Sequence, residues 1–321
     1  MPAKIEKTGN DAINLMSPIF SNEDTAREFL ESKRWPNGAE CPRCDCKTVY
    51  KLEPKPESLR PVRPGVYKCK GCRKQFTVRI GTIFEESKLP LRKWLAAIFL
   101  MCSAKKGVSS HQLARELDVT VKTAWFLSHR IREAMKQEPL AGMIGGAGKT
   151  VEADETYIGA RKPRYKGTSK RGRGTNKKPV ALVVERDGNA HAAPVERVNG
   201  DCLMSEVLQY ASNESILMTD ELPVYVKIGK EFEKHESVNH GEKEYARDDS
   251  HVNTAESYFS LLKRAYVGAH HHYTARHLHR YVTERSFHWN LRKQSDGERM
   301  VQAIEGAEGK RLKYREPSCS D

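Results

Sequence analysis

The sequence has no apolar run long enough to cross a lipid bilayer. Its longest run, Trp94 to Ala104, has about half the length that a transmembrane helix needs, and lysine and arginine residues flank it. The N-terminal segment also lacks the apolar core of a secretory signal peptide. We therefore expect a soluble, cytoplasmic protein without membrane contact, in which Trp94 to Ala104 is a buried helix.

Acidic residues are in deficit. The chain has 42 Asp and Glu against 55 Lys and Arg, which gives a formal net charge of +13 and a pI of about 9.3. Such an excess attracts a polyanion, most simply nucleic acid, because bound phosphates release their counterions. Hydrophobic residues make up 38% of the 321 residues, which is enough for two or three compact units with real cores.

Cysteine is used sparingly, and half of the eight cysteines lie in two CxxC pairs. The pairs are Cys41 with Cys44 and, after 24 intervening residues, Cys69 with Cys72. Two such pairs can place four thiolates tetrahedrally around Zn²⁺. Disulfides or redox motifs are the alternative, but they need an oxidising compartment or a thioredoxin-like strand and helix that the sequence does not indicate. We predict a helix plus a zinc ribbon over residues 21–84, and prefer Cys44 to Cys46 as a ligand.

A helix-turn-helix pattern follows, within a helical DNA-binding domain predicted over residues 87–138. It consists of a short amphipathic helix around Leu113, a turn at Asp118 to Thr120, and a longer helix from Val121 that Thr120 would cap. An ordinary helical hairpin is the alternative, but the positive charge of the chain favours a DNA-binding motif. Polar residues on the exposed face of the second helix would meet phosphates or base edges. These residues are Lys122, Thr123, His129, Arg130 and Arg132.

The composition changes after the glycine-rich segment AGMIGGAGK. Three strand-like runs (TVEADETYI, PVALVVERDG and HAAPVERV) precede a helix at Asp201 to Ala211, a short buried strand SILMTDE, and a helix near Val224 to Phe232. This order predicts a mixed α/β domain over residues 149–293, closed by a helix from about Ala275 to Arg292. The remaining residues, 294–321, are predicted to be a short polar tail that packs loosely.

Two aspartates, Asp154 and Asp220, lie at the ends of two of these strands. Carboxylates at neighbouring strand ends converge in space even when they are far apart in sequence. Glu256 lies on a predicted helix from Thr254 to Tyr266, whose apolar stripe would lay it beside the two aspartates. Each acid alone is more often structural, but together they favour a metal site.

A basic segment directly follows the strand of Asp154. Residues Arg161 to Lys178 hold nine Lys or Arg and no acid. A solvated, disordered loop is one interpretation, and a clamp on a phosphate backbone is another; both hold if the segment orders on binding. Its place beside Asp154 favours DNA.

Taken together, these blocks resemble the DDE insertion-sequence transposases. The resemblance is to the bacterial group with an N-terminal zinc ribbon before an RNase H-like (ISXO2-like) catalytic domain, and it covers the chain from about Ser21 to Pro317. It implies an α/β multidomain protein with a zinc ribbon, a helix-turn-helix and an RNase H-like mixed-sheet domain. The blocks that carry it are VEADETYIG, TDE, HVNTAESYFSLLKR and YVTERSFHWNLRK.

The resemblance also implies the roles of single residues. Asp154 and Asp220 match the two metal-binding aspartates of the family, and Glu256 matches its third acidic position. Lys263 matches the basic residue of the last block, two helical turns after Glu256, where it would hold a phosphate. The remaining DNA-contacting candidates in this region are Arg264, His251 and Asn253.

The implied activity is DNA transposition with divalent metal, Mg²⁺ or Mn²⁺, at the three carboxylates. The protein would cut double-stranded DNA at transposon ends and join the freed 3′-hydroxyl to target DNA, in association with the nucleoid. Acting on two ends requires at least a dimer, so a homo-oligomer on DNA is expected. The alternatives are a non-catalytic DNA-binding regulator, which the complete triad argues against, and a metal-dependent nuclease without strand transfer.

Overall fold

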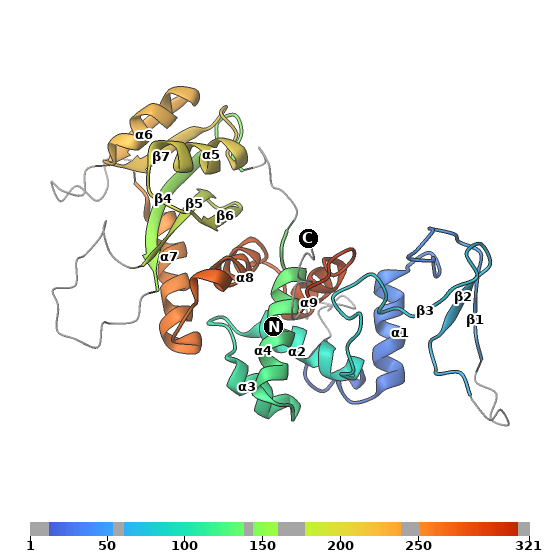
Figure 1. Cartoon of the computed structure of the whole chain (residues 1–321). Coiled ribbons are helices and arrows are strands. Elements are labelled where there is room, and N and C mark those ends of the chain that lie inside the picture. The colour runs from blue at the N-terminus through green and yellow to red at the C-terminus, as the bar shows by residue number, and fades with distance from the viewer. Residues whose placement is uncertain (1–12, 54–60, 138–143, 160–176, 239–250, 314–321) are drawn as a thin grey trace, which may run out of the picture. The chain divides into compact units, whose positions relative to one another are not determined.

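The computed structural model describes residues 13–53, 61–137, 144–159, 177–238 and 251–313. They form two compact units (Figure 1). Unit 1 combines the described residues up to Met135 with those from Gln294 onward, and unit 2 lies between them in sequence, from Lys136 to Lys293. The predicted ribbon and helix-turn-helix therefore belong to one unit. Within the ranges described, no helix is long and apolar enough to cross a membrane.

The ribbon of unit 1 is a small antiparallel sheet with the strand order β1-β2-β3. Helix α1 (Glu23–Arg34) precedes it and is capped by Asn22, whose side chain accepts hydrogen bonds from two backbone N–H groups of the first turn. The rings of Trp35, Tyr67 and Phe76 pack together at the end of α1, with centroids 5.4 to 5.9 Å apart. The strands are β1 (Val49–Lys51), β2 (Tyr67–Cys69) and β3 (Gln75–Phe76).

Unit 1 contains the predicted buried helix and both helices of the predicted helix-turn-helix. Helix α2 contains eight buried residues, and the hairpin of α3 and α4 has the predicted cap, since the Thr120 hydroxyl accepts a hydrogen bond from the Thr123 N–H at 3.2 Å. A helix at the C-terminal side, α9, contacts α1, α2 and α4. The helices are α2 (Leu91–Ser103), α3 (Ser110–Leu117), α4 (Val121–Ala134) and α9 (Asp296–Glu305).

The prediction of a loosely packed tail from residue 294 is wrong for the part that the structure describes. Helix α9 begins with a capping box between Ser295 and Glu298 and buries Met300, Val301 and Ile304. These apolar residues lie on one face of the helix, and the polar Gln302 between them is exposed. The average composition of the segment is polar, but the spacing of its apolar residues is helical.

Unit 2 contains a five-stranded mixed sheet with the order β6-β5-β4-β7-β8. Strand β5 pairs with β4 and β6 in antiparallel fashion, and β7 pairs in parallel with β4 and β8. The sheet has the mixed pairing that the sequence predicted and the strand order of the RNase H-like fold that the resemblance implied; its fifth strand, β8, was not predicted. The strands are β4 (Thr150–Ile158), β5 (Lys178–Glu185), β6 (Ala190–Pro194), β7 (Ile216–Asp220) and β8 (Lys234–Val238).

Helices cover both faces of this sheet, so its central strands are apolar on both sides. Along β5, Leu182 packs with residues of α7 and α8, whereas its neighbour Val183 packs with residues of α5 and α6. This alternation directs successive β4 residues to opposite faces as well. The helices are α5 (Gly200–Tyr210), α6 (Pro223–Ile228), α7 (Asn253–Ala265) and α8 (Leu278–Asn290).

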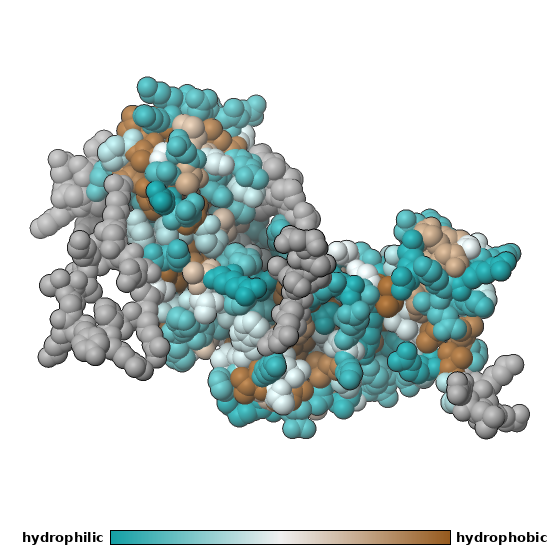
Figure 2. Space-filling view, viewed as in Figure 1, coloured by the Kyte–Doolittle hydropathy of each residue, from teal (hydrophilic) through white to brown (hydrophobic). Residues whose placement is uncertain are grey.

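Hydrophilic residues cover most of the face of each unit that Figure 2 shows. The surface agrees with the 30% charged residues of the sequence. Most of the large apolar side chains that the structure describes lie in the cores, with a few exceptions such as Val121 and Val226. Among the described lysines and arginines, Arg130, Arg132 and Arg285 are buried, and the others are at least partly exposed, so a polyanion can reach most of the positive charge.

Candidate active site and metal centre

Two carboxylates meet where β4 and β7 run side by side. In the parallel register, Glu152 of β4 lies opposite Met218 of β7. Two residues further along each strand, this register brings Asp154 beside Asp220, the last residue of β7. The predicted convergence of these two aspartates at neighbouring strands therefore matches the structure.

A third carboxylate, that of Glu155, completes the group. Oxygen atoms of Asp154, Glu155 and Asp220 all lie within 4.8 Å of one another. The phenol of Tyr225 on α6 donates a hydrogen bond of 3.0 Å to Glu155 Oε2. Burial and the Glu155 carboxylate raise the pKa of Tyr225 well above its usual value, so this phenol remains a donor. Glu155 was not among the predicted site residues, although the adjacent acids of VEADETYI were a signal for it.

The proximity of these acids raises the proton affinity of Asp154. Burial and, to a smaller extent, the Asp220 and Glu155 carboxylates raise the pKa of the Asp154 carboxyl to about 8. A hydrogen bond of 2.7 Å from the Glu155 N–H to Asp154 Oδ1 opposes it. Half-buried oxygens with mutual repulsion fit a divalent cation, since hard oxygen ligands are those that Mg²⁺ and Mn²⁺ prefer.

Glu256 lies outside this group in the part of the chain that is described. It is exposed in the first turn of α7, and its charge makes a smaller contribution to the raised pKa of Asp154. Asp154 and α7 lie on the same side of the sheet, because even-numbered residues of β4 face that side, as Ile158 does. The structure thus brings Asp154 and Asp220 together and places Glu256 on the helix that faces Asp154.

The basic residues predicted on α7 lie at its other end. Lys263 and Arg264 are exposed, and Lys263 follows Glu256 by seven residues, so both lie on one side of the helix. The Lys263 ammonium lies 6.0 Å from the centre of the Phe259 ring. Arg264 donates a hydrogen bond of 2.8 Å to the hydroxyl of Ser260.

The other two candidates near α7 differ in their surroundings. Asn253 is exposed as the first residue of the helix. His251 is half-buried, and its backbone oxygen accepts a hydrogen bond of 2.9 Å from Arg186. Its Nδ1 lies 3.1 Å from Arg186 Nη2 and 3.4 Å from Glu152 Oε1. His251 is thus part of a charged network that the sequence analysis did not foresee.

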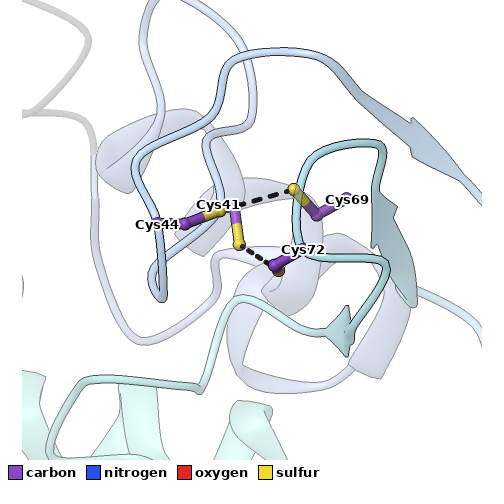
Figure 3. Close-up of side chains that lie close together, drawn as sticks. All are labelled: Cys41, Cys44, Cys69 and Cys72. Atoms are coloured by element: carbon purple, nitrogen blue, oxygen red, sulfur yellow. Dashed lines mark hydrogen bonds between the residues drawn. The ribbon is translucent and has the colours of Figure 1, made fainter.

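The four predicted cysteines of the ribbon form one cluster (Figure 3). The sulfur atoms of Cys41 and Cys72 are 3.7 Å apart, and those of Cys44 and Cys69 are 3.6 Å apart. Four ligands at Zn–S distances of about 2.3 Å in a tetrahedron have sulfur separations of about 3.8 Å, so the spacing fits zinc.

Backbone donors prepare two of these thiols for deprotonation. The Lys74 N–H lowers the pKa of Cys72 to about 7, and the Cys72 N–H lowers the pKa of Cys69. The thiolate is the form that binds metal. The Cys46 sulfur, which is not in the cluster, instead lies 3.8 Å from the backbone oxygen of Thr48. The cluster is therefore a potential zinc site with the ligands that the CxxC spacing indicated.

The expectation that His129, Arg130 and Arg132 lie on an exposed face of the second helix is wrong. All three are buried in α4, with 0%, 5% and 2% of their surface exposed. Arg130 Nη2 donates a hydrogen bond of 2.6 Å to the backbone oxygen of Glu85, and its guanidinium lies over the Trp94 ring. Helix α4 packs against both α2 and α9, and all of its residues from Ser128 to Ala134 except Glu133 are buried.

The N-terminal half of α4 does present polar side chains to solvent. Lys122 and Thr123 are exposed there. These are the residues of the predicted helix-turn-helix that remain available for a phosphate or a base edge. The basic segment from Arg161 lies almost entirely outside the described residues.

Two family models match the sequence. Residues 143–290 match the ISXO2-like transposase domain, and residues 21–75 match the transposase zinc-ribbon domain. The first match contains Asp154, Asp220 and Glu256, and the second contains the four cysteines of the ribbon.

A curated relative covers both regions. A protein in the transposable element ISH50 of Halobacterium salinarum is 32% identical over 265 residues, which is 78% of this chain and 85% of that protein.

Two solved structures align over much of the chain at low similarity. One is the Mos1 strand transfer complex, with 16% identity, a TM-score of 0.27, and coverage of 68% of this chain and 76% of that chain. The other is a pre-cleavage Mos1 transpososome, with 14% identity, a TM-score of 0.20, and coverage of 71% of this chain and 82% of that chain.

Proposed function

The chain belongs to the family of ISXO2-like transposases, and we propose that it cleaves DNA at transposon ends and transfers the freed 3′-hydroxyl into target DNA. The observation that supports this most is the group of carboxylates at the adjacent strands β4 and β7. Three acids within 4.8 Å, one of them with its pKa raised to about 8, form a ligand set for divalent metal.

In this proposal Asp154 and Asp220 hold the metal, and Glu256 supplies the third ligand from α7. Mg²⁺ is the expected ion, with Mn²⁺ as a substitute. The chemistry that a pair of such ions supplies is activation of the attacking hydroxyl and stabilisation of the leaving oxygen. Glu155 is a competing third ligand, because it lies inside the group of oxygens and Glu256 lies outside it.

The surrounding residues would bind and orient the DNA. Lys263 lies two helical turns from Glu256 and is exposed, so its ammonium can neutralise a phosphate of the strand being cut. Arg264 and Asn253 are exposed on the same helix and are proposed as further contacts. In unit 1, Lys122 on α4 would contact the transposon end, and the zinc ribbon would present its own basic surface to double-stranded DNA.

The cleavage test uses the purified chain, a DNA duplex carrying the ends of its element, and Mg²⁺. Cleaved 3′-ends and joined products are separated on a denaturing gel. Asp154→Asn, Asp220→Asn and Glu256→Gln should each reduce both products by at least about a hundredfold, as expected when a ligand of a catalytic metal is lost. Asp201→Asn, an exposed acid on α5, serves as the matched control and should retain activity.

Each outcome of this test has a distinct meaning. Cleavage without joined products would identify a metal-dependent nuclease and overturn strand transfer. Full activity of Asp154→Asn would show that the active site is not at these carboxylates. If Glu155→Gln loses activity and Glu256→Gln retains it, the third metal ligand is Glu155 and not Glu256.

Two ends must be held together for joining, so we propose a homo-oligomer that assembles on DNA at the nucleoid. Light scattering of the chain alone and with end DNA measures this directly. A complex with one protein copy and one DNA end under conditions that give joined products would contradict it.

A further inference from the structure

A buried glutamate that the proposed chemistry does not use lies two residues before Asp154. Glu152 is on β4, has none of its surface exposed, and projects from the same side of the strand as Asp154. A carboxylate at such a position costs several kcal/mol to bury unless its oxygens are paired. The partners that pair it therefore indicate what it does.

All of its partners lie next to the start of α7 or on the β5–β6 turn. Glu152 Oε2 accepts a hydrogen bond of 2.9 Å from the Ala255 N–H, and Oε1 accepts one of 2.9 Å from the Thr254 hydroxyl. Arg186 Nε donates to Oε1 at 2.8 Å. The carboxylate is thus fully engaged in holding the first turn of α7 and one arginine.

This arrangement replaces a local helix cap. The residue before α7 is Val252, which has no polar side chain to accept the free N–H groups of the first turn. Glu152 accepts one of them from across the domain, and its negative charge lies at the positive end of the helix dipole. The helix start is therefore fixed to β4.

Arg186 connects Glu152 to the residues just before α7. Its Nη2 donates to the backbone oxygen of His251 at 2.9 Å and lies 3.1 Å from His251 Nδ1. The same guanidinium therefore neutralises Glu152 and holds the segment that leads into α7. His251 belongs to this network and has its Nδ1 occupied within it, so a role in positioning α7 suits it better than a DNA contact.

We propose that Glu152, with Arg186 and Thr254, is a positioning residue that sets where Glu256 stands relative to Asp154. Asp154 follows Glu152 by two residues on one strand face, and Glu256 directly follows Ala255, whose N–H Glu152 holds. The network therefore ties the strand of one proposed metal ligand to the helix turn of another. The inference rests on the proposed function, because it takes Glu256 as a metal ligand.

The test measures Mn²⁺ affinity of the full-length, zinc-loaded chain without DNA, by the loss of the free Mn²⁺ electron paramagnetic resonance signal. Thr254→Val removes the hydroxyl and leaves every charge in place. It should weaken Mn²⁺ binding about tenfold, as is usual when a residue that orients a metal ligand is lost. Thr254→Ser restores the hydroxyl and should restore the affinity, and Ser257→Ala, an exposed change on the same helix, should have no effect.

A double-variant comparison shows whether the effect passes through Glu256. In the Glu256→Gln background, Thr254→Val should cause no further loss of Mn²⁺ affinity. An equal loss in both backgrounds, or none in either, overturns the positioning role. Thermal melting of each variant checks the fold, and Arg186→Lys, which keeps the charge but not the paired contacts, supplies a second variant if Thr254→Val does not fold.

The same measurements separate this inference from the function on which it rests. If Glu256→Gln and Asp154→Asn leave Mn²⁺ affinity unchanged, the proposed ligand set is wrong. If they weaken it and Thr254→Val does not, the ligand set stands and only the role of Glu152 is wrong.

Discussion

The guanidinium of Arg34 and the carboxylate of Glu308 form a two-pronged ion pair across 274 positions of sequence, with N–O distances of 2.6 and 2.7 Å. Arg34 ends α1, and Glu308 follows α9. Arg34 also donates to the backbone oxygen of Val78 at 2.6 Å, so it joins helix, ribbon and C-terminal segment within unit 1. Planar, paired contacts of this kind are specific to arginine.

Replacing Arg34 should destabilise unit 1 more than replacing its partner. The Arg34 side chain is 6% exposed and that of Glu308 is 56% exposed, so solvent screens the carboxylate. Arg34→Ala leaves the Val78 oxygen without this donor and should cost about 1–3 kcal/mol, whereas Glu308→Ala should cost less than about 1 kcal/mol. Urea unfolding of the two variants measures the difference, and equal losses would contradict it.

Zinc should be lost when a cysteine of the cluster is changed. Cys72→Ser removes one of four thiolate ligands, and a ribbon with so small a core depends on its metal for folding. We expect less than one equivalent of bound zinc by metal analysis and rapid proteolysis within residues 41–76. Cys46→Ser should retain zinc, because Cys46 lies outside the cluster; loss of zinc in this control would mean that the ligand set is different.

The stability of the protein without Mg²⁺ should fall as the pH rises. The pKa of Asp154 is about 8 in the folded chain and near 3.8 when unfolded, so the folded state binds the proton more tightly. The stabilising contribution is complete below about pH 4 and is lost progressively until the pH passes 8. Asp154→Asn cannot ionise, and its unfolding midpoint in urea should fall less between pH 6 and 8.5. Parallel pH profiles for the two proteins would show that Asp154 is not the group responsible.

Two basic residues of α4 should have separable effects. Lys122 is exposed, so Lys122→Ala should weaken binding to end DNA and reduce the salt dependence of that binding by about one ion. Arg130 is 5% exposed, so Arg130→Ala should lower the free energy of unfolding by about 1–3 kcal/mol. Fluorescence anisotropy at several salt concentrations and urea unfolding measure both, and unchanged DNA binding in Lys122→Ala would remove α4 from the interface.

The parts of the molecule that could be predicted from sequence are those in which one local pattern determines the outcome. The CxxC spacing fixes which four thiols can share an ion, and the continuous apolar run PVALVV identifies β5 as a strand covered on both faces. Strand β8 was missed because KHESV lies at the sheet edge and is polar.

The errors arose where burial depends on partners distant in sequence. Arg130 and Arg132 have the charge of solvated residues, but α4 packs against α2, α3 and α9, and both side chains are buried. Glu152 has an acid's usual preference for solvent, and only the unpaired first turn of α7 and the Arg186 guanidinium make its burial favourable. No spacing rule within β4 contains that information.

Unit 1 is built from two segments of sequence that are separated by the whole of unit 2. This division affects the order in which the chain can fold during synthesis. The helix α9, which buries Met300 and Ile304 in unit 1, is translated after all of unit 2. On the ribosome, the unit that carries the proposed DNA contacts of α4 therefore remains incomplete while the carboxylate-bearing sheet can already form. A nascent chain would acquire its finished DNA-binding surface last, so a ribosome that stops before α9 releases a product with the sheet but without a complete unit to guide it to DNA.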